Sequence, residues 1–151
     1  MADRFFGLSG SVAVGTNKAL WNLISATTVR PRVYDIVVGC VATPADLGTN
    51  FQVVRTTAVG TEGSGFTPTA LDPGSPASLC DIAQGVFTAE PTKTASSSIL
   101  SFSMNQRATF RWVAAPGGEL VAPKSANNGL CLESLSSGGT TAHESMVHWN
   151  E

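Results

Sequence analysis

The residue types that most often carry out chemistry are sparse in this sequence and are not grouped. His143 and His148 lie five positions apart, so on one β-strand their side chains would point to opposite faces and could not bind the same metal ion. Cys40, Cys80 and Cys131 are widely separated and odd in number, which fits neither a disulfide framework nor a CxxC metal site. We therefore expect reduced, buried thiols, no metal and no cofactor.

Two further patterns that could support ligand binding or catalysis are incomplete. Residues 60–65, GTEGSG, are similar to a phosphate-binding loop, but no lysine follows them and Thr67-Pro68 interrupts the chain where a helix would have to begin. The carboxylates are dispersed: Asp46, Asp72 and Asp81 form no calcium-binding array, and no pair stands out as the acid and nucleophile of a glycosidase. We predict that the chain is not an enzyme.

Arginine is the residue type that points most clearly to protein contacts. Six arginines stand against three lysines, and arginine is enriched at protein interfaces where lysine is depleted. The arginines considered as contact residues are Arg30, Arg32, Arg55, Arg107 and Arg111. Arg107 and Arg111 would lie on one face of a strand, roughly 13 Å apart. That face is either simply solvated or a contact between subunits.

Length and composition favour one compact domain with a surface that carries few charges. The chain has 151 residues, of which 42% are hydrophobic and only 13% charged. A formal net charge of −2 leaves no basic surface for nucleic acid or for a membrane. No apolar run reaches the 18 residues of a membrane helix, and the first residues do not form a signal peptide.

The spacing of glycine and proline favours an all-β domain, because strands fit between these residues and helices of average length do not. The clearest alternation runs from Arg107 to Ala114, where Phe110 and Trp112 should point inward. Val33 to Ala42 is the expected central strand. Further strands are predicted over 19–28, 51–59, 100–104, 119–122, 130–135 and 142–149. About eight strands predict an antiparallel β-sandwich of the jelly-roll type.

Three segments are expected to depart from this sandwich. Residues 77–84 could form a two-turn helix, with Ser75 as N-cap, Pro76 at its first position and Gly85 after its end. Residues 60–76 are too rich in Gly, Pro, Ser and Thr for regular structure. Residues 1–17 are predicted to be an extended arm, and residues 18–151 the sandwich domain. We expect apolar side chains of the arm to dock on a neighbouring protein; they are Phe5, Phe6 and Leu8.

Four segments resemble a family of small jelly-roll virion proteins of tailed bacteriophages, including cyanophages. They are RPRVYDIVVGCVATPAD (30–46), TALDPGSPA (69–77), MNQRATFRWVAAPGGELVAP (104–123) and ANNGLCLES (126–134). The resemblance implies a capsid decoration or cement protein, made in the host cytoplasm and bound to the major capsid protein on the outer surface of the head. It also implies self-association, typically as a homotrimer. Arg107 and Arg111 would then pair with acidic groups across a contact.

The alternative function is a carbohydrate- or receptor-binding jelly-roll module on a phage tail or head fibre. Sugar-binding sites commonly combine an exposed aromatic ring with polar groups that converge on the ligand. The sequence offers Trp21, Trp112 and Trp149 as such rings. Trp112 should point inward, which weakens this alternative.

Overall fold

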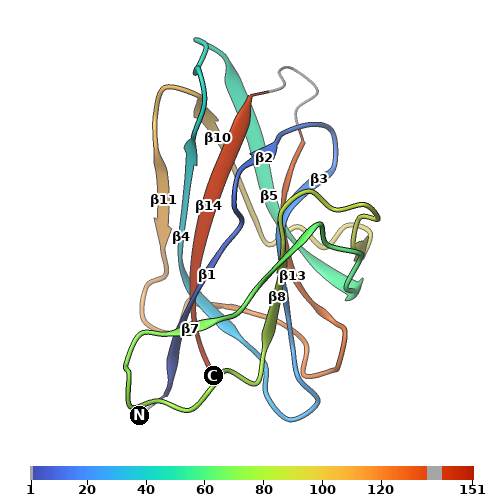
Figure 1. The fold of residues 1–151 in the computed structure, drawn as a ribbon, viewed down its shortest axis with the longest axis vertical. Coiled ribbons are helices and arrows are strands. Elements are labelled where there is room, and N and C mark those ends of the chain that lie inside the picture. Colours follow the sequence, from blue (N-terminus) through green and yellow to red (C-terminus); the bar gives the residue numbers. More distant parts are fainter. Residues whose placement is uncertain (1, 136–140) are drawn as a thin grey trace.

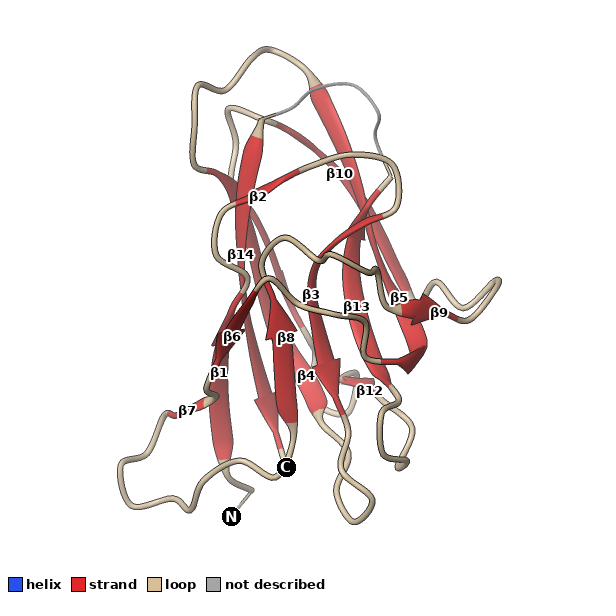
Figure 2. Cartoon of the chain, turned by 45° about the vertical axis from the view of Figure 1, so that its right-hand side comes forward, coloured by secondary structure: helices blue, strands red, loops and turns tan. Residues whose placement is uncertain are grey.

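The computed structural model describes residues 2–135 and 141–151, which form two antiparallel β-sheets packed face to face (Figure 1 and Figure 2). The first sheet has the order β11 (Phe110–Val113), β4 (Arg32–Cys40), β14 (Ala142–Asn150), β1 (Arg4–Leu8) and β7 (Thr69–Ala70); β12 (Leu120–Val121) pairs with β4, and β2 (Val12–Ala13) with β14. The second sheet has the order β10 (Leu100–Asn105), β5 (Gly48–Ala58), β13 (Gly129–Ser134), β3 (Lys18–Ile24), β8 (Asp81–Gln84) and β6 (Ser64–Phe66); β9 (Thr92–Lys93) pairs with β5. The predicted all-β sandwich is confirmed.

Eight of these strands have the connectivity of a jelly roll. In chain order they are β1, β3, β4, β5, β10, β11, β13 and β14, and every connection except β5 to β10 passes from one sheet to the other. The resulting orders, β1-β14-β4-β11 and β3-β13-β5-β10, are those of two interlocked Greek keys. The remaining segment, residues 59–99 between β5 and β10, is an insertion that carries β6, β7, β8 and β9.

The core between the sheets is built from the inward half of each alternating strand. In β14 the even-numbered residues are half-exposed, whereas His143, Ser145, Val147 and Trp149 are buried. The expected central strand is β4, which pairs with β14 on one side and with β11 and β12 on the other. In β11 the predicted orientation is also correct, because both Phe110 and Trp112 pack against the core. The largest fully buried side chains include Trp21, Trp149, Phe5, Phe51, Leu20 and Leu23.

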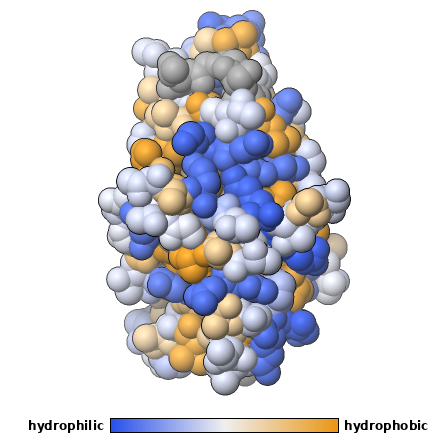
Figure 3. All heavy atoms as spheres, turned by 90° about the vertical axis from the view of Figure 1, so that its right-hand side faces the viewer, coloured by the Kyte–Doolittle hydropathy of each residue, from blue (hydrophilic) through white to orange (hydrophobic). Residues whose placement is uncertain are grey.

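The insertion covers part of the outer face of the second sheet. Phe87 packs there against Ala19, Ile24, Val54 and Cys131, which lie on the opposite side of their strands from the main core. Figure 3 shows this side of the molecule, on which hydrophilic residues gather in a band and hydrophobic atoms lie in smaller separate areas. The apolar residues on the outer face of β3, β13 and β5 are thus covered by the chain itself, whereas the outward residues of β10 are exposed and polar.

The prediction of a free arm over residues 1–17 is wrong for its central part. Residues 4–8 are β1, a full member of the first sheet that pairs with β14 along its whole length and with β7 on its other side. Phe5 is 1% exposed and stacks on Trp149, with ring centroids 5.9 Å apart. Gly7 lets β1 approach β8, because a Cβ at this position would lie 2.5 Å from Cδ1 of Ile82. Met1 lies outside the described residues.

The structure also corrects the predicted helix and the predicted irregular loop. Residues 81–84 form β8, which pairs with β3 on one edge and β6 on the other, and the described residues contain no helix. A helix of two turns is only marginally stable by itself, whereas the two ladders satisfy the backbone of this segment on both sides. Residues 60–76 contain two short strands, β6 and β7, which extend the edges of the two sheets. Sequence composition signalled neither pairing.

His143 makes the stability of the fold sensitive to acid. Its side chain is 0% exposed, its Nδ1 lies 3.1 Å from the carbonyl oxygen of Thr141, and its Nε2 has no hydrogen-bond partner among the described residues. Burial lowers the pKa of His143, and the bond to Thr141 opposes that shift. Protonation is therefore less favourable in the folded chain than in the unfolded chain.

We expect the free energy of unfolding to be fully retained above about pH 6.5, the ordinary pKa of histidine, and to fall as the pH drops below it. The slope contributed by His143 has an upper limit of about 1.4 kcal/mol per pH unit. Urea unfolding between pH 7.5 and 5.5 measures it, and the variant His143→Leu should have a flatter profile. Identical pH slopes for the two proteins would show that His143 is not the group responsible.

Candidate contact surface

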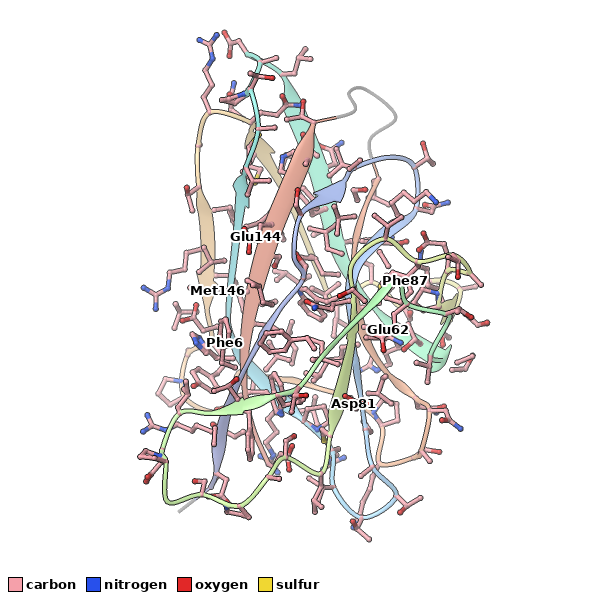
Figure 4. All side chains as sticks on the ribbon, in the orientation of Figure 1. Phe6, Glu62, Asp81, Phe87, Glu144 and Met146 are labelled. Atoms are coloured by element: carbon pink, nitrogen blue, oxygen red, sulfur yellow. The ribbon has the colours of Figure 1, made fainter. Side chains whose placement is uncertain are left out.

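The outer face of the first sheet is formed by side chains that alternate with the core. In β14, Glu144, Met146 and His148 point outward, and in β1, Phe6 and Leu8 do so. Figure 4 shows Phe6, Met146 and Glu144 spread along these two strands. We call this face the contact surface; its other members are Arg4, Arg32, Tyr34, Asp35, Val37, Gly39, Arg111, Val113 and Asn150.

Strand pairing arranges apolar and aromatic side chains in rows across this surface. Met146 is directly paired with Leu8 on β1 and with Val37 on β4, which gives an apolar row in the middle of the sheet. In the next row the imidazole of His148 lies between Phe6 and Tyr34, with ring centroids 5.6 and 5.9 Å away. Aromatic side chains, methionine and arginine are the residues enriched in the cores of protein interfaces.

A charged cluster borders these rows. Arg111 donates two hydrogen bonds to Asp35, from Nε to Oδ1 at 3.0 Å and from Nη2 to Oδ2 at 2.7 Å. The Nδ1 atom of His148 lies 3.4 Å from the same Oδ2. The side chain of Asp35 is 6% exposed and that of Arg111 is 62% exposed. The Arg111 guanidinium bonded to Asp35 holds the pKa of this carboxyl below its usual range, so Asp35 stays ionised beside Arg111.

A shallow hollow of about 230 Å³ lies at the end of the surface that carries Glu144. Its border includes Leu8, Gly39, Thr109, Glu144 and Met146. A Cβ at Gly39 would make an ordinary van der Waals contact with Oγ1 of Thr109, 3.7 Å away. The hollow is therefore a place where another molecule could insert a side chain.

The predicted contact residues are only partly brought together. Four of them, Phe6, Leu8, Arg32 and Arg111, lie on the contact surface. The predicted role of Phe5 is wrong, because its ring is in the chain's own core. The other positions are away from the surface: Arg30 in the loop before β4, Arg55 on β5 and Arg107 in the turn after β10.

Two expectations about the arginines also need correction. Arg107 does not share a strand face with Arg111, since Ala108 N bonds to Asn105 O and closes a turn between the two sheets. Arg111 was expected to pair with an acid of another molecule, but its acid is Asp35 of the same chain. Sequence reasoning did not identify Met146, His148, Glu144 or Tyr34 as contact residues. The predicted strand over residues 142–149 could have placed the first three on one face, because successive side chains of a strand point to opposite faces.

The groups that could support catalysis are dispersed in the described part of the chain. Burial raises the pKa of the Cys80 thiol to about 12 and that of the Cys131 thiol further, so neither supplies a thiolate at neutral pH. His143 and His148 point to opposite faces of β14, as predicted. In residues 2–135 and 141–151, no three His, Cys, Asp or Glu side chains are grouped so as to hold a metal ion, and no helix is long and apolar enough to cross a membrane.

A hollow of about 630 Å³ lies beside β8 and is bordered by Glu62 and Asp81, which Figure 4 labels. Both carboxylates accept backbone hydrogen bonds, Glu62 from Gln84 N at 2.9 Å and Asp81 from Ile82 N at 2.8 Å. These two bonds help to hold the backbone of β8 in place.

Comparison with known proteins adds no relative to this description. The chain matches no protein-family model, and no curated protein is significantly similar to it.

Proposed function

We propose that this chain is a structural protein that acts by binding other proteins through the contact surface. The observation that carries this proposal is the difference between the two sheets. The chain's own insertion covers the apolar residues on the outer face of the second sheet, whereas the outer face of the first leaves Phe6, Leu8 and Met146 only half-buried and Val113 56% exposed. Contiguous exposed apolar residues with a polar border are typical of protein-binding surfaces.

More specifically, we propose that the chain is a capsid decoration protein of a tailed phage, which stabilises the head from outside by binding the major capsid protein. The resemblance of the four sequence segments suggests this setting, and the jelly-roll connectivity is compatible with it. The carbohydrate-binding alternative has less support. Trp21 and Trp149 are 0% exposed and Trp112 packs against the core, so none of the three tryptophans forms an exposed platform.

To test this role, purified protein is added to phage heads that lack the protein, and the amount of protein that sediments with the heads is measured. We expect the wild-type chain to bind. The variant Leu8→Asp should bind at least about tenfold more weakly, because burying a carboxylate in an apolar contact is unfavourable. Failure of the wild-type chain to bind any head would contradict the decoration role.

The matched control is Leu79→Asp, which makes the same change at a leucine that is 64% exposed and outside the contact surface. This variant should bind like the wild type. Urea unfolding of both variants separates lost binding from lost folding. Equal binding by Leu8→Asp and Leu79→Asp would show that the contact surface is not the one used on the head.

A further inference from the structure

The two ends of the contact surface carry opposite charges that the chain does not pair. Arg4, Arg32 and Glu144 form no ion pair within residues 2–135 and 141–151. Both arginines are exposed and Glu144 is half-exposed. Most other acids of the described chain accept hydrogen bonds from its own backbone or side chains. Glu144 is therefore a carboxylate without an ion-pair partner in the described chain. It lies at one end of the contact surface, and Arg4 and Arg32 lie at the other end.

Strand register places these charges symmetrically. Asn150 is directly paired with Arg4 on β1 and with Arg32 on β4, so the two arginines flank β14 in one row. Glu144 lies on the same side of β14, six residues away, which is about 20 Å along a strand. Val147 is midway between the two ends, and the aromatic and apolar rows lie on either side of it.

A two-fold axis in the plane of the contact, perpendicular to β14 and opposite Val147, would exchange the two ends. The Glu144 end of one copy would then face the row of Arg32, Asn150 and Arg4 of the other copy, and the apolar row around Met146 in each copy would face the aromatic row around His148 in the other. Arg32 would lie opposite the hollow at Gly39, beside Glu144. Packed sheets are rotated by about 30°, which shifts residues 10 Å from the axis by about one strand spacing. With this shift Glu144 still meets one of the two arginines.

We propose that the contact surface binds a second copy of the chain, in a face-to-face dimer held by reciprocal pairing of Glu144 with Arg4 and Arg32. Self-complementarity of one patch is what a two-fold interface requires. The inference rests on the proposed function for the choice of face: the second copy occupies the same face that binds the head, so the dimer has to open before that face binds there. A dimer differs from the homotrimer that the resemblance to virion proteins implies.

The test is sedimentation velocity of the full chain over a concentration series. The wild-type chain should form dimers that weaken with rising salt. The variant Glu144→Arg should dimerise at least about tenfold more weakly, because it places like charges opposite each other. The double variant Arg4→Glu, Arg32→Glu should be weakened in the same way. Combining all three substitutions restores opposite charges and should restore the dimer.

The control is Asp81→Arg, which makes the same charge change on β8 of the other sheet and should leave the dimer intact. A monomeric or trimeric wild-type chain would overturn the inference, as would unchanged dimerisation of Glu144→Arg or no recovery in the triple variant. The proposed function is tested separately. A monomer that binds heads overturns only the dimer, and a dimer that binds no heads overturns only the decoration role.

Discussion

Replacing Phe5 with alanine is expected to lower the free energy of unfolding by about 3–5 kcal/mol, the usual cost of truncating a buried aromatic side chain. Phe5 is 1% exposed, stacks on Trp149 and belongs to the main core cluster. Its loss would leave a cavity between β1 and the second sheet. Urea unfolding of the purified variant measures the change.

The neighbouring residue provides the control. Phe6 lies on the opposite face of β1 and is only half-buried, so Phe6→Ala should cost clearly less than Phe5→Ala. Residues 4–8 also form one strand of the first sheet. We therefore expect that a chain that begins at residue 18 does not fold, because it lacks β1 and with it the partner of one edge of β14. A small and equal effect of the two alanine substitutions would mean that residues 4–8 are a detachable arm after all.

The second large effect on stability is expected from the ion pair between Lys93, on β9 of the insertion, and Glu133 on β13. Glu133 is 3% exposed; its Oε2 lies 2.6 Å from Nζ of Lys93, and its Oε1 accepts a hydrogen bond from Gln52 at 2.7 Å. Lys93→Met removes the cation and keeps much of the side-chain length. We expect a loss of about 3–5 kcal/mol in the free energy of unfolding, because the Glu133 carboxylate is left buried without its partner.

A matched lysine distinguishes this explanation from a general effect of charge. Lys18 is 50% exposed and pairs with Glu90 at 3.3 Å, so Lys18→Met should cost less than about 1 kcal/mol. Adding Glu133→Gln to Lys93→Met removes the unpaired charge and should recover part of the loss. Chemical denaturation of the four proteins gives these differences. No recovery in the double variant would contradict the explanation by an unpaired buried charge.

The sequence predicted those elements whose alternation is local and regular. Residues 142–149 were predicted to form a strand, and the odd spacing of His143 and His148 then places the two side chains on opposite faces, as the alternating burial of β14 shows. The Val- and Ile-rich stretch of β4 indicated a central strand for a similar reason. The jelly-roll class followed from the number of strands and from the loops between them.

The wrong predictions concern segments whose structure depends on distant partners. Residues 4–8 form a short segment that contains Gly7, and only pairing with β14, more than 130 positions away, makes them a strand. Residues 77–84 carry local helix signals, but β3 and β6 offer ladders on both sides of β8. The contact surface could be predicted only in part, because Arg4 and Arg32 become neighbours of Asn150 through pairings that periodicity does not reveal.

The most direct test of the account is whether the contact surface becomes covered when the protein assembles. Met146 lies in the middle of this surface, and Cys80 and Cys131 are buried, so Met146→Cys in a Cys40→Ser background gives one reporter thiol. We would measure its rate of maleimide labelling in dilute protein and in protein assembled at high concentration or on heads. We expect fast labelling of the dilute protein and strong protection after assembly. Equal labelling rates in all states would contradict the claim that this face binds a neighbour.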